Sequence, residues 1–135
     1  MKIVDWGDSM KESWRPGSET RFHASARSGA KRLCVGEQWF EPGVGTPVAR
    51  HADEVEEVIS VLHGVAEVTV DGETQLLTVG QSAIVPGGTP HQVVAAGEEQ
   101  LHIWFVLSAP APVAYFADDT VVTMGTDEND GWASA

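Results

Sequence analysis

Four residues in the middle of this 135-residue chain are of the types that bind metal ions. His51, Asp53 and Glu57 lie close together in the stretch from Gly45 to Gly64, and His91 follows a short apolar run. Imidazole and carboxylate groups together suit divalent transition ions (Fe, Mn, Zn, Ni or Co), whereas Ca²⁺ favours an all-oxygen shell. Four such ligands leave part of a six-coordinate shell open to water or substrate, as in a reactive site. The residue types therefore predict one divalent transition metal per chain.

The alternation of the sequence indicates that strands position these residues. Successive side chains of a strand point to opposite faces, so residues 51, 53 and 57 share a face if the turn between them preserves the alternation. Apolar runs recur about every 8–12 residues with Gly or Pro between them, which favours an all-β sandwich or barrel. Asp71-Gly72 predicts a hairpin with a type I′ turn. We expect strands at residues 19–26, 30–41, 57–62, 65–70, 73–78, 82–85, 92–95 and 100–107, with an edge strand at 113–116 or 120–123.

The charge balance limits the partners. Twenty acidic and eight basic side chains give a formal net charge of −12. Such a surface repels phosphate backbones and anionic lipids, so we expect no nucleic acid and no membrane partner. The sequence shows no signal peptide and a single cysteine, which predicts a cytoplasmic protein. An anionic substrate would need local attraction from one of the arginines Arg21, Arg27, Arg32 and Arg50.

The length predicts a single domain, residues 1–135. Residues 1–18 are expected to form an N-terminal arm packed on that domain, because Trp6 and Trp14 are costly to leave in water. Residues 19–108 would form the barrel, and residues 109–135 a C-terminal extension. The last ten or so residues are acidic and small, which predicts a mobile tail.

The first of two fragments resembles the first motif of the cupin superfamily. That motif is a Gly, five residues, His-x-His, three or four residues, Glu, six residues and a Gly. In this chain the matching positions are Gly45, His51, Glu57 and Gly64, and Asp53 stands where the second His is expected.

The second fragment resembles the second cupin motif, a Gly, five residues, Pro-x-Gly, two residues, His, three residues and an Asn. The matching positions are Gly80, Pro86, Gly88 and His91, and Ala95 replaces the Asn. The resemblance implies an all-β fold, a double-stranded β-helix or jelly-roll-like cupin barrel of two antiparallel sheets, usually a homodimer.

The resemblance also implies His51, Glu57 and His91 as metal ligands. Asp53 is expected to be a fourth ligand or, if it does not bind the ion, a general base. Two carboxylates would neutralise a divalent ion, so water bound to it should be less acidic than with three imidazoles.

Neighbouring strands predict further residues of the pocket. Gln38 and Phe40 are candidates on one strand, and His102 and Trp104 on another. On the second strand the residues of opposite parity form the cleaner apolar face, and the sequence leaves open which set lines the cavity. His23 and His63 are interpreted as loop or surface residues.

Two classes of function follow. The first is a metal-dependent enzyme acting on a small organic molecule. It would be an oxygenase if the ion is redox-active, or a lyase, isomerase or cyclase if the ion polarises a carbonyl or hydroxyl. The alternative is a non-catalytic protein that binds or senses a small ligand, with or without metal.

Overall fold

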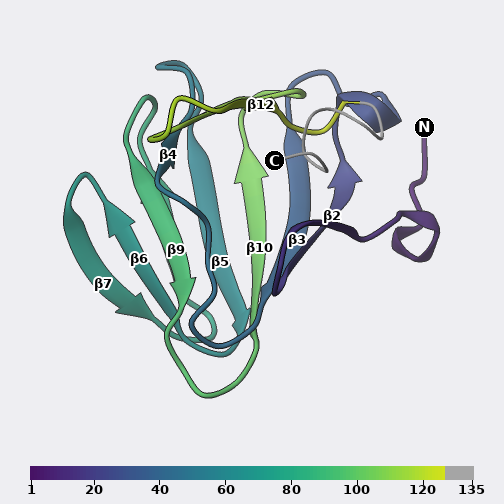
Figure 1. The fold of residues 1–135 in the computed structure, drawn as a ribbon. Coiled ribbons are helices and arrows are strands. Elements are labelled where there is room, and N and C mark those ends of the chain that lie inside the picture. Colours follow the sequence, from purple (N-terminus) through teal and green to yellow (C-terminus); the bar gives the residue numbers. More distant parts are fainter. Residues whose placement is uncertain (127–135) are drawn as a thin grey trace.

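Two antiparallel β-sheets face each other and enclose the core of the protein (Figure 1). The computed structural model of the chain describes residues 1–126. The first sheet has the strand order β1-β2-β3-β10-β5-β8, and the second has the order β12-β11-β4-β9-β6-β7. Within each sheet all the strand pairs are antiparallel. This architecture confirms the predicted all-β barrel of two sheets.

The chain starts in the first sheet and, from β3 to β11, crosses repeatedly between the two sheets. The first sheet contains β1 (Glu12–Arg15), β2 (Ser18–Ala24), β3 (Cys34–Phe40), β5 (Glu57–His63), β8 (Ser82–Val85) and β10 (Leu101–Leu107). The second contains β4 (Ala49–Arg50), β6 (Ala66–Val70), β7 (Glu73–Leu77), β9 (His91–Ala95), β11 (Val113–Phe116) and β12 (Val121–Thr123). The regular structure of residues 1–126 also includes two short 3-10 helices, η1 (Trp6–Asp8) and η2 (Ala26–Ser28). Neither of these described helices is long and apolar enough to cross a membrane.

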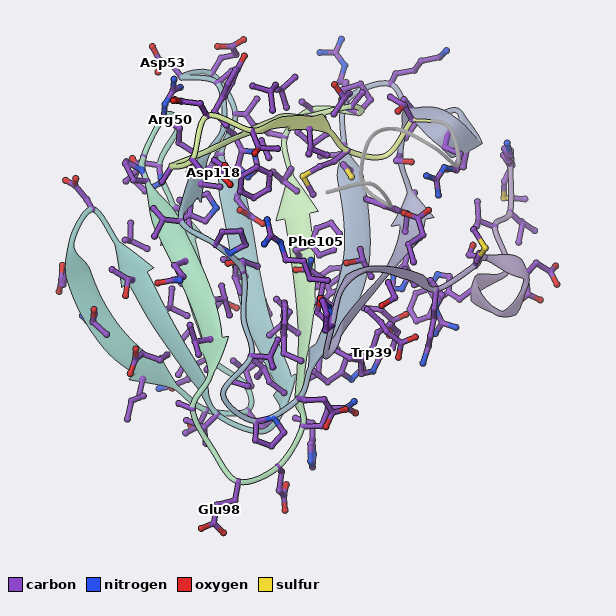
Figure 2. The ribbon with its side chains drawn as sticks, viewed as in Figure 1. Trp39, Arg50, Asp53, Glu98, Phe105 and Asp118 are labelled. Atoms are coloured by element: carbon purple, nitrogen blue, oxygen red, sulfur yellow. The ribbon has the colours of Figure 1, made fainter. Side chains whose placement is uncertain are left out.

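Strand β10 shows which face of the first sheet is buried. One set of alternate side chains lies in the core, while His102 and Trp104 lie on the outer face, where Trp104 is 38% exposed. Burial of apolar surface stabilises this register, because a slip by one residue would exchange the two sets. The buried set is Leu101, Ile103, Phe105 and Leu107. Figure 2 labels Phe105 on this strand.

The turn between β6 and β7 has the predicted type. Val70 pairs with Glu73, so Asp71 and Gly72 form a two-residue loop. Both loop residues have positive φ, 50° and 81°, as a type I′ turn requires. Asp71 tolerates this conformation better than most side chains, and Gly72 has no Cβ to oppose it.

Both ends of the described chain contribute strands. In the N-terminal arm, β1 pairs with β2 across a turn at Gly17, whose φ is 81°. The sequence did not indicate this strand, because residues 12–15 show no apolar alternation. Near the other end, β11 and β12 form a hairpin joined to β4, so both candidate segments form strands and β12 lies at the edge of the sheet. The predicted mobile tail falls mainly on residues 127–135, outside the described residues.

Candidate metal centre

Three of the predicted ligands converge between the two sheets. His51 directly follows β4 and points inward like Ala49, two residues earlier. His91 begins β9 beside Ala49, with which it pairs. Glu57 begins β5 in the opposite sheet. The ligand atoms of His51, Glu57 and His91, which we call the inner cluster, all lie within 4.8 Å of one another, and the three residues are buried.

The outward nitrogen of each imidazole is held by a backbone carbonyl. His51 Nδ1 donates to the oxygen of Val113 at 2.9 Å, and His91 Nδ1 donates to the oxygen of Thr89 at 2.9 Å. Because a carbonyl oxygen can only accept, each Nδ1 carries the proton and each neutral ring has its lone pair on Nε2. These two Nε2 atoms lie 3.3 and 2.8 Å from one oxygen of Glu57. Lone pairs facing a carboxylate repel each other unless protons or a cation lie among them.

In the absence of an ion, the pKa values of Glu57 and His91 show where a proton lies in the inner cluster. Burial raises the pKa of Glu57, but hydrogen bonds from His51 and His91 outweigh burial and lower it to about 2. Burial lowers the pKa of His91, but the hydrogen bond and charge of Glu57 and the Thr89 carbonyl outweigh burial and raise it. A proton on His91 therefore takes the place that a bound cation would fill.

The spacing of the inner cluster fits a transition ion. Bonds of roughly 2.0–2.2 Å from such an ion, separated by about 90–110°, place neighbouring ligand atoms roughly 3 Å apart. The distances from Glu57 to the two imidazoles, 3.3 and 2.8 Å, lie around this value. Two imidazoles and one carboxylate form a donor set that suits Zn, Fe, Mn, Co or Ni. The hydrogen bonds to Val113 and Thr89 would orient both ligands in the way common at metal sites.

The structure does not bring Asp53 into the inner cluster. Its side chain is exposed at the edge of the molecule (Figure 2). Residues 52–55 form a turn, closed by a hydrogen bond from Val55 N to Ala52 O, so the strand alternation on which the prediction depended stops there. Asp53 instead packs against the turn before His91. A Cβ on Gly87 would lie 1.8 Å from the Asp53 carbonyl oxygen, and one on Gly88 would lie 2.3 Å from its carboxylate. These glycines let the loops carrying His51 and His91 approach each other.

A cavity of about 50 Å³ adjoins the inner cluster, and most of its wall is apolar. Besides the inner cluster, its polar lining residues are Gln38 and Thr46. Thr46 Oγ1 accepts a hydrogen bond from Val93 N, which ties this wall to β9. The apolar wall comes from both sheets and from the segment after β12: Pro47, Ile59, Val93, Ile103, Phe116 and Met124.

The predicted pocket residues divide between the two faces of the first sheet. Gln38 lines the cavity. Phe40 has the same parity but is buried in the apolar core beyond it. His102 and Trp104 lie on the outer face, so the inward residue of β10 at the cavity is Ile103. The sequence did not identify Thr46, which occupies one of the variable positions of the first motif, or Phe116 and Met124, which lie outside both motifs.

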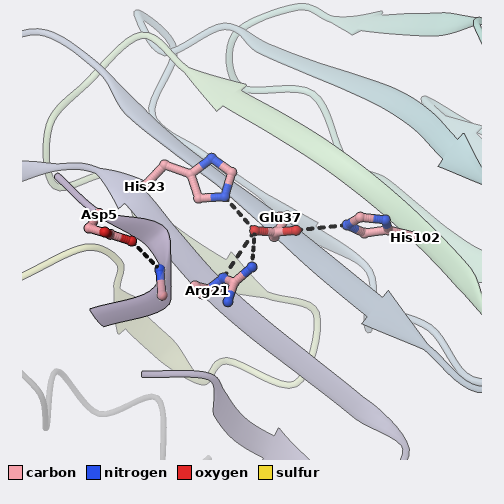
Figure 3. A network of polar contacts seen from close by, with 6 residues as sticks. Asp5, Arg21, His23, Glu37 and His102 are labelled. Atoms are coloured by element: carbon pink, nitrogen blue, oxygen red, sulfur yellow. Dashed lines mark hydrogen bonds and ion pairs between the residues drawn. The ribbon is translucent and has the colours of Figure 1, made fainter. Parts of the chain in front are cut away.

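A second arrangement of one carboxylate and two imidazoles lies on the outer face of the same sheet (Figure 3). Glu37 Oε2 is 2.5 Å from His23 Nε2, and Glu37 Oε1 is 2.8 Å from His102 Nε2. Arg21 donates to Glu37 Oε2 through two nitrogens, at 3.1 and 3.0 Å. Burial raises the pKa of Glu37, but its hydrogen bonds to His23, His102 and Arg21 outweigh burial and lower it. We call Arg21, His23, Glu37 and His102 the outer cluster.

Comparisons with known proteins place these residues in a family context. Residues 28–107 match the family model of the cupin domain, Cupin_2. The chain is also 32% identical over 113 residues to mannose-1-phosphate guanylyltransferase of Escherichia coli (strain K12), covering 83% of this chain and 22% of that enzyme. The chain thus spans about a fifth of the length of the curated relatives it matches.

Solved structures share the fold. A sugar phosphate isomerase of the cupin superfamily from Silicibacter pomeroyi aligns with a TM-score of 0.72 and 22% identity, covering 90% of this chain and 86% of that one. The polyketide cyclase RemF from Streptomyces resistomycificus aligns with a TM-score of 0.66 and 23% identity, covering 98% and 90% of the two chains. The family model covers more than half of the sequence and both motifs, and the two-sheet barrel agrees with it. The chain therefore belongs to the cupin domain family.

Proposed function

We propose that this protein is a metal-dependent enzyme that acts on a small organic molecule, with a divalent transition ion held by His51, Glu57 and His91. The observation that carries the proposal is the convergence of two Nε2 lone pairs and one carboxylate oxygen at the wall of a cavity. Asp53 is left out of this ligand set because its side chain is exposed on a turn.

The residues of the chain would orient and shield the reacting molecule. His51 and His91 are fixed by backbone carbonyls, so their ring orientations are set before any ion or substrate arrives. Glu57 stays ionised across the physiological range, because its pKa is lowered to about 2. The apolar wall excludes bulk water, which strengthens electrostatic interactions inside. When bound, the ion would supply Lewis-acid chemistry or, if it is iron or manganese, redox chemistry.

A second candidate function is binding without turnover. Among the described residues that line the cavity, the titratable side chains are those of the inner cluster. A reaction that needs a separate general acid or base would find none on this wall, which favours a ligand-binding or sensor protein. The predicted homodimer and cytoplasmic location apply to either function and stay predictions.

Metal analysis tests the proposal. We expect about one transition ion per chain in the purified protein and little in the double variant His51→Ala, Glu57→Ala. The matched control is His63→Ala, Glu99→Ala, because these residues form another His–Glu pair at 2.8 Å with side chains 59% and 70% exposed. The control should retain the ion. Equal metal in all three proteins, or none in the parent, would contradict the proposal.

The kind of ion then separates the reaction classes. Iron together with oxygen consumption would support an oxygenase. Zinc or nickel without oxygen uptake would support a lyase, isomerase or cyclase. A tightly held small molecule that is released unchanged, with no turnover of plausible substrates, would favour the binding function.

A further inference from the structure

The cavity beside the inner cluster restricts which molecules can enter it. Its volume of about 50 Å³ is far below the roughly 300–1,000 Å³ of pockets that enclose drug-sized ligands. Ile59, Ile103 and Phe116 line it from elements that are packed in the core of the barrel. An occupant that leaves this wall in place has only a few non-hydrogen atoms.

The charges around the cavity exclude a phosphate group. A phosphate dianion is normally held by arginine, lysine or a series of backbone amides. None of the eight basic side chains, which all lie within the described residues, lines the cavity. Arg21 is bonded to Glu37 and Arg27 to Glu12, and Arg50 lies over Tyr115. A divalent ion bound by two neutral imidazoles and ionised Glu57 keeps one net positive charge, which suits a single negative charge.

Gln38 supplies a fixed polar group in this mainly apolar wall. The residue is 8% exposed, and its Nε2 donates to Thr20 Oγ1 at 3.0 Å. Thr20 is fully buried in β2, so the bond locks the plane of the amide. Among the described residues, no hydrogen bond reaches Gln38 Oε1. Because this oxygen is not one of the fully buried atoms without a partner, part of its surface is accessible. It is therefore an acceptor open to the cavity, able to accept a hydrogen bond from a hydroxyl group.

We infer that the cavity selects a compact hydroxy acid, whose carboxylate is directed to the inner cluster and whose hydroxyl donates to Gln38, and that it rejects sugar phosphates. The inference rests on the proposed function in one respect, because the carboxylate is directed to the inner cluster by the ion bound there. The role of Gln38 rests on its own geometry. Gln38 is thus assigned as a specificity residue, which the resemblance to the family did not mark.

Paired ligands test the role of Gln38. The probes are 3-hydroxypropanoate against butanoate and 4-hydroxybutanoate against pentanoate, so each pair exchanges a hydroxyl for a methyl group. Binding is measured by calorimetry, and on cobalt-loaded protein also by the visible absorption of the ion. In the native protein we expect the hydroxy acid to bind roughly tenfold more tightly in at least one pair, because a buried hydrogen bond contributes about that factor. Mannose 6-phosphate should change neither signal.

The variant Gln38→Leu should lose the preference for the hydroxyl while keeping its affinity for the alkanoate and its cobalt content. The control Gln100→Leu removes an exposed glutamine bonded to Glu41 and should keep the preference. Equal binding within both pairs in the native protein, an equal loss for both members in Gln38→Leu, or tighter binding of the sugar phosphate would overturn the inference.

The same measurements separate this inference from the proposed function. A protein that binds cobalt but shows no hydroxyl preference would contradict the role of Gln38 and leave the proposed function standing. A protein without metal that still shows a preference dependent on Gln38 would support this role and contradict the proposed function. Cobalt content measured on each variant identifies any loss due to misfolding.

Discussion

Two carboxylates of this protein each lie between two imidazoles, and they differ in what else reaches them. In the inner cluster both imidazoles approach the same oxygen of Glu57. In the outer cluster His23 and His102 approach different oxygens of Glu37, from opposite sides of the carboxylate (Figure 3). Arg21 also donates to Glu37. The same residue types therefore form a potential ion site in one place and a charge-neutralising network in the other.

The difference has a physical cause in the surroundings of each carboxylate. Glu57 faces a cavity whose described lining residues include no arginine or lysine, so its charge is available to a cation. Glu37 is already balanced by Arg21, which would repel an approaching cation. The inner cluster thus leaves a carboxylate available to a cation, whereas the outer cluster holds β2, β3 and β10 together on the outer face.

Removing the carboxylate of the outer cluster should have the largest effect on stability. Glu37→Leu leaves Arg21, His23 and His102 without their shared acceptor, and losing hydrogen bonds to a charged group costs about 1.5–3 kcal/mol. The free energy of unfolding, measured with urea, should fall by that amount. Metal content per folded chain should not change, because Glu37 is not part of the inner cluster. The variant Glu37→Gln keeps some of the hydrogen bonds, so its free energy of unfolding should lie between those of the native protein and Glu37→Leu. An unchanged unfolding energy, or a parallel loss of metal, would show that the two clusters do not have separate roles.

The convergence of His51, Glu57 and His91 could be anticipated because their positions depend on local features. Glu57 and His91 begin strands with clear alternation, and both point inward with their apolar neighbours. The Gly45 of the motif permits close packing, since a Cβ there would lie 2.1 Å from the Val93 oxygen. The alternation expected at Asp53 fails because residues 52–55 form a turn, and no alternation rule applies to a turn.

The outer cluster could not be predicted from the sequence for two reasons. The pairing of β2 with β3 shifts between Phe22 and Ala24, so both Phe22 and His23 are buried and the alternation fails. The cover over His23 comes from Trp6, in an arm that has no regular periodicity. His23 was therefore interpreted as a surface residue, although its side chain is only 6% exposed. By contrast, His63 is exposed, as expected.

The pH dependence of metal binding sharpens the comparison further. The raised pKa of His91 means that a proton occupies the inner cluster below that pKa and must leave when an ion binds. Below the pKa of His91, metal affinity should therefore rise with pH, and it should level off above that pKa. Glu57, with a pKa of about 2, stays ionised throughout and adds no slope. Competition with a chelator of known affinity measures this profile.

The free energy of unfolding of the metal-free protein should change with pH in the direction opposite to metal affinity. A raised pKa stabilises the folded state fully below the ordinary value of 6.5, and this contribution is lost as pH rises through the folded pKa of His91. Unfolding of the metal-free protein should become easier over that window, whereas the metal-loaded protein should not show this loss. A metal affinity that is flat or falls with rising pH would contradict the exchange of proton for ion.

The smallest expected effect belongs to the arm that covers the outer cluster. Trp6 stacks on His23 with ring centroids 3.7 Å apart and an angle of 11° between the rings, yet Trp6 is 51% exposed. Because the ring is only half buried, Trp6→Ala should lower the free energy of unfolding by about 1 kcal/mol, and Trp6→Phe should restore part of it. Urea unfolding measures both, and metal affinity should not change in either. A loss as large as that of Glu37→Leu would mean that the arm, rather than Arg21 and the two imidazoles, holds the outer cluster in place. No loss at all would mean that Glu37 and its partners suffice to bury His23.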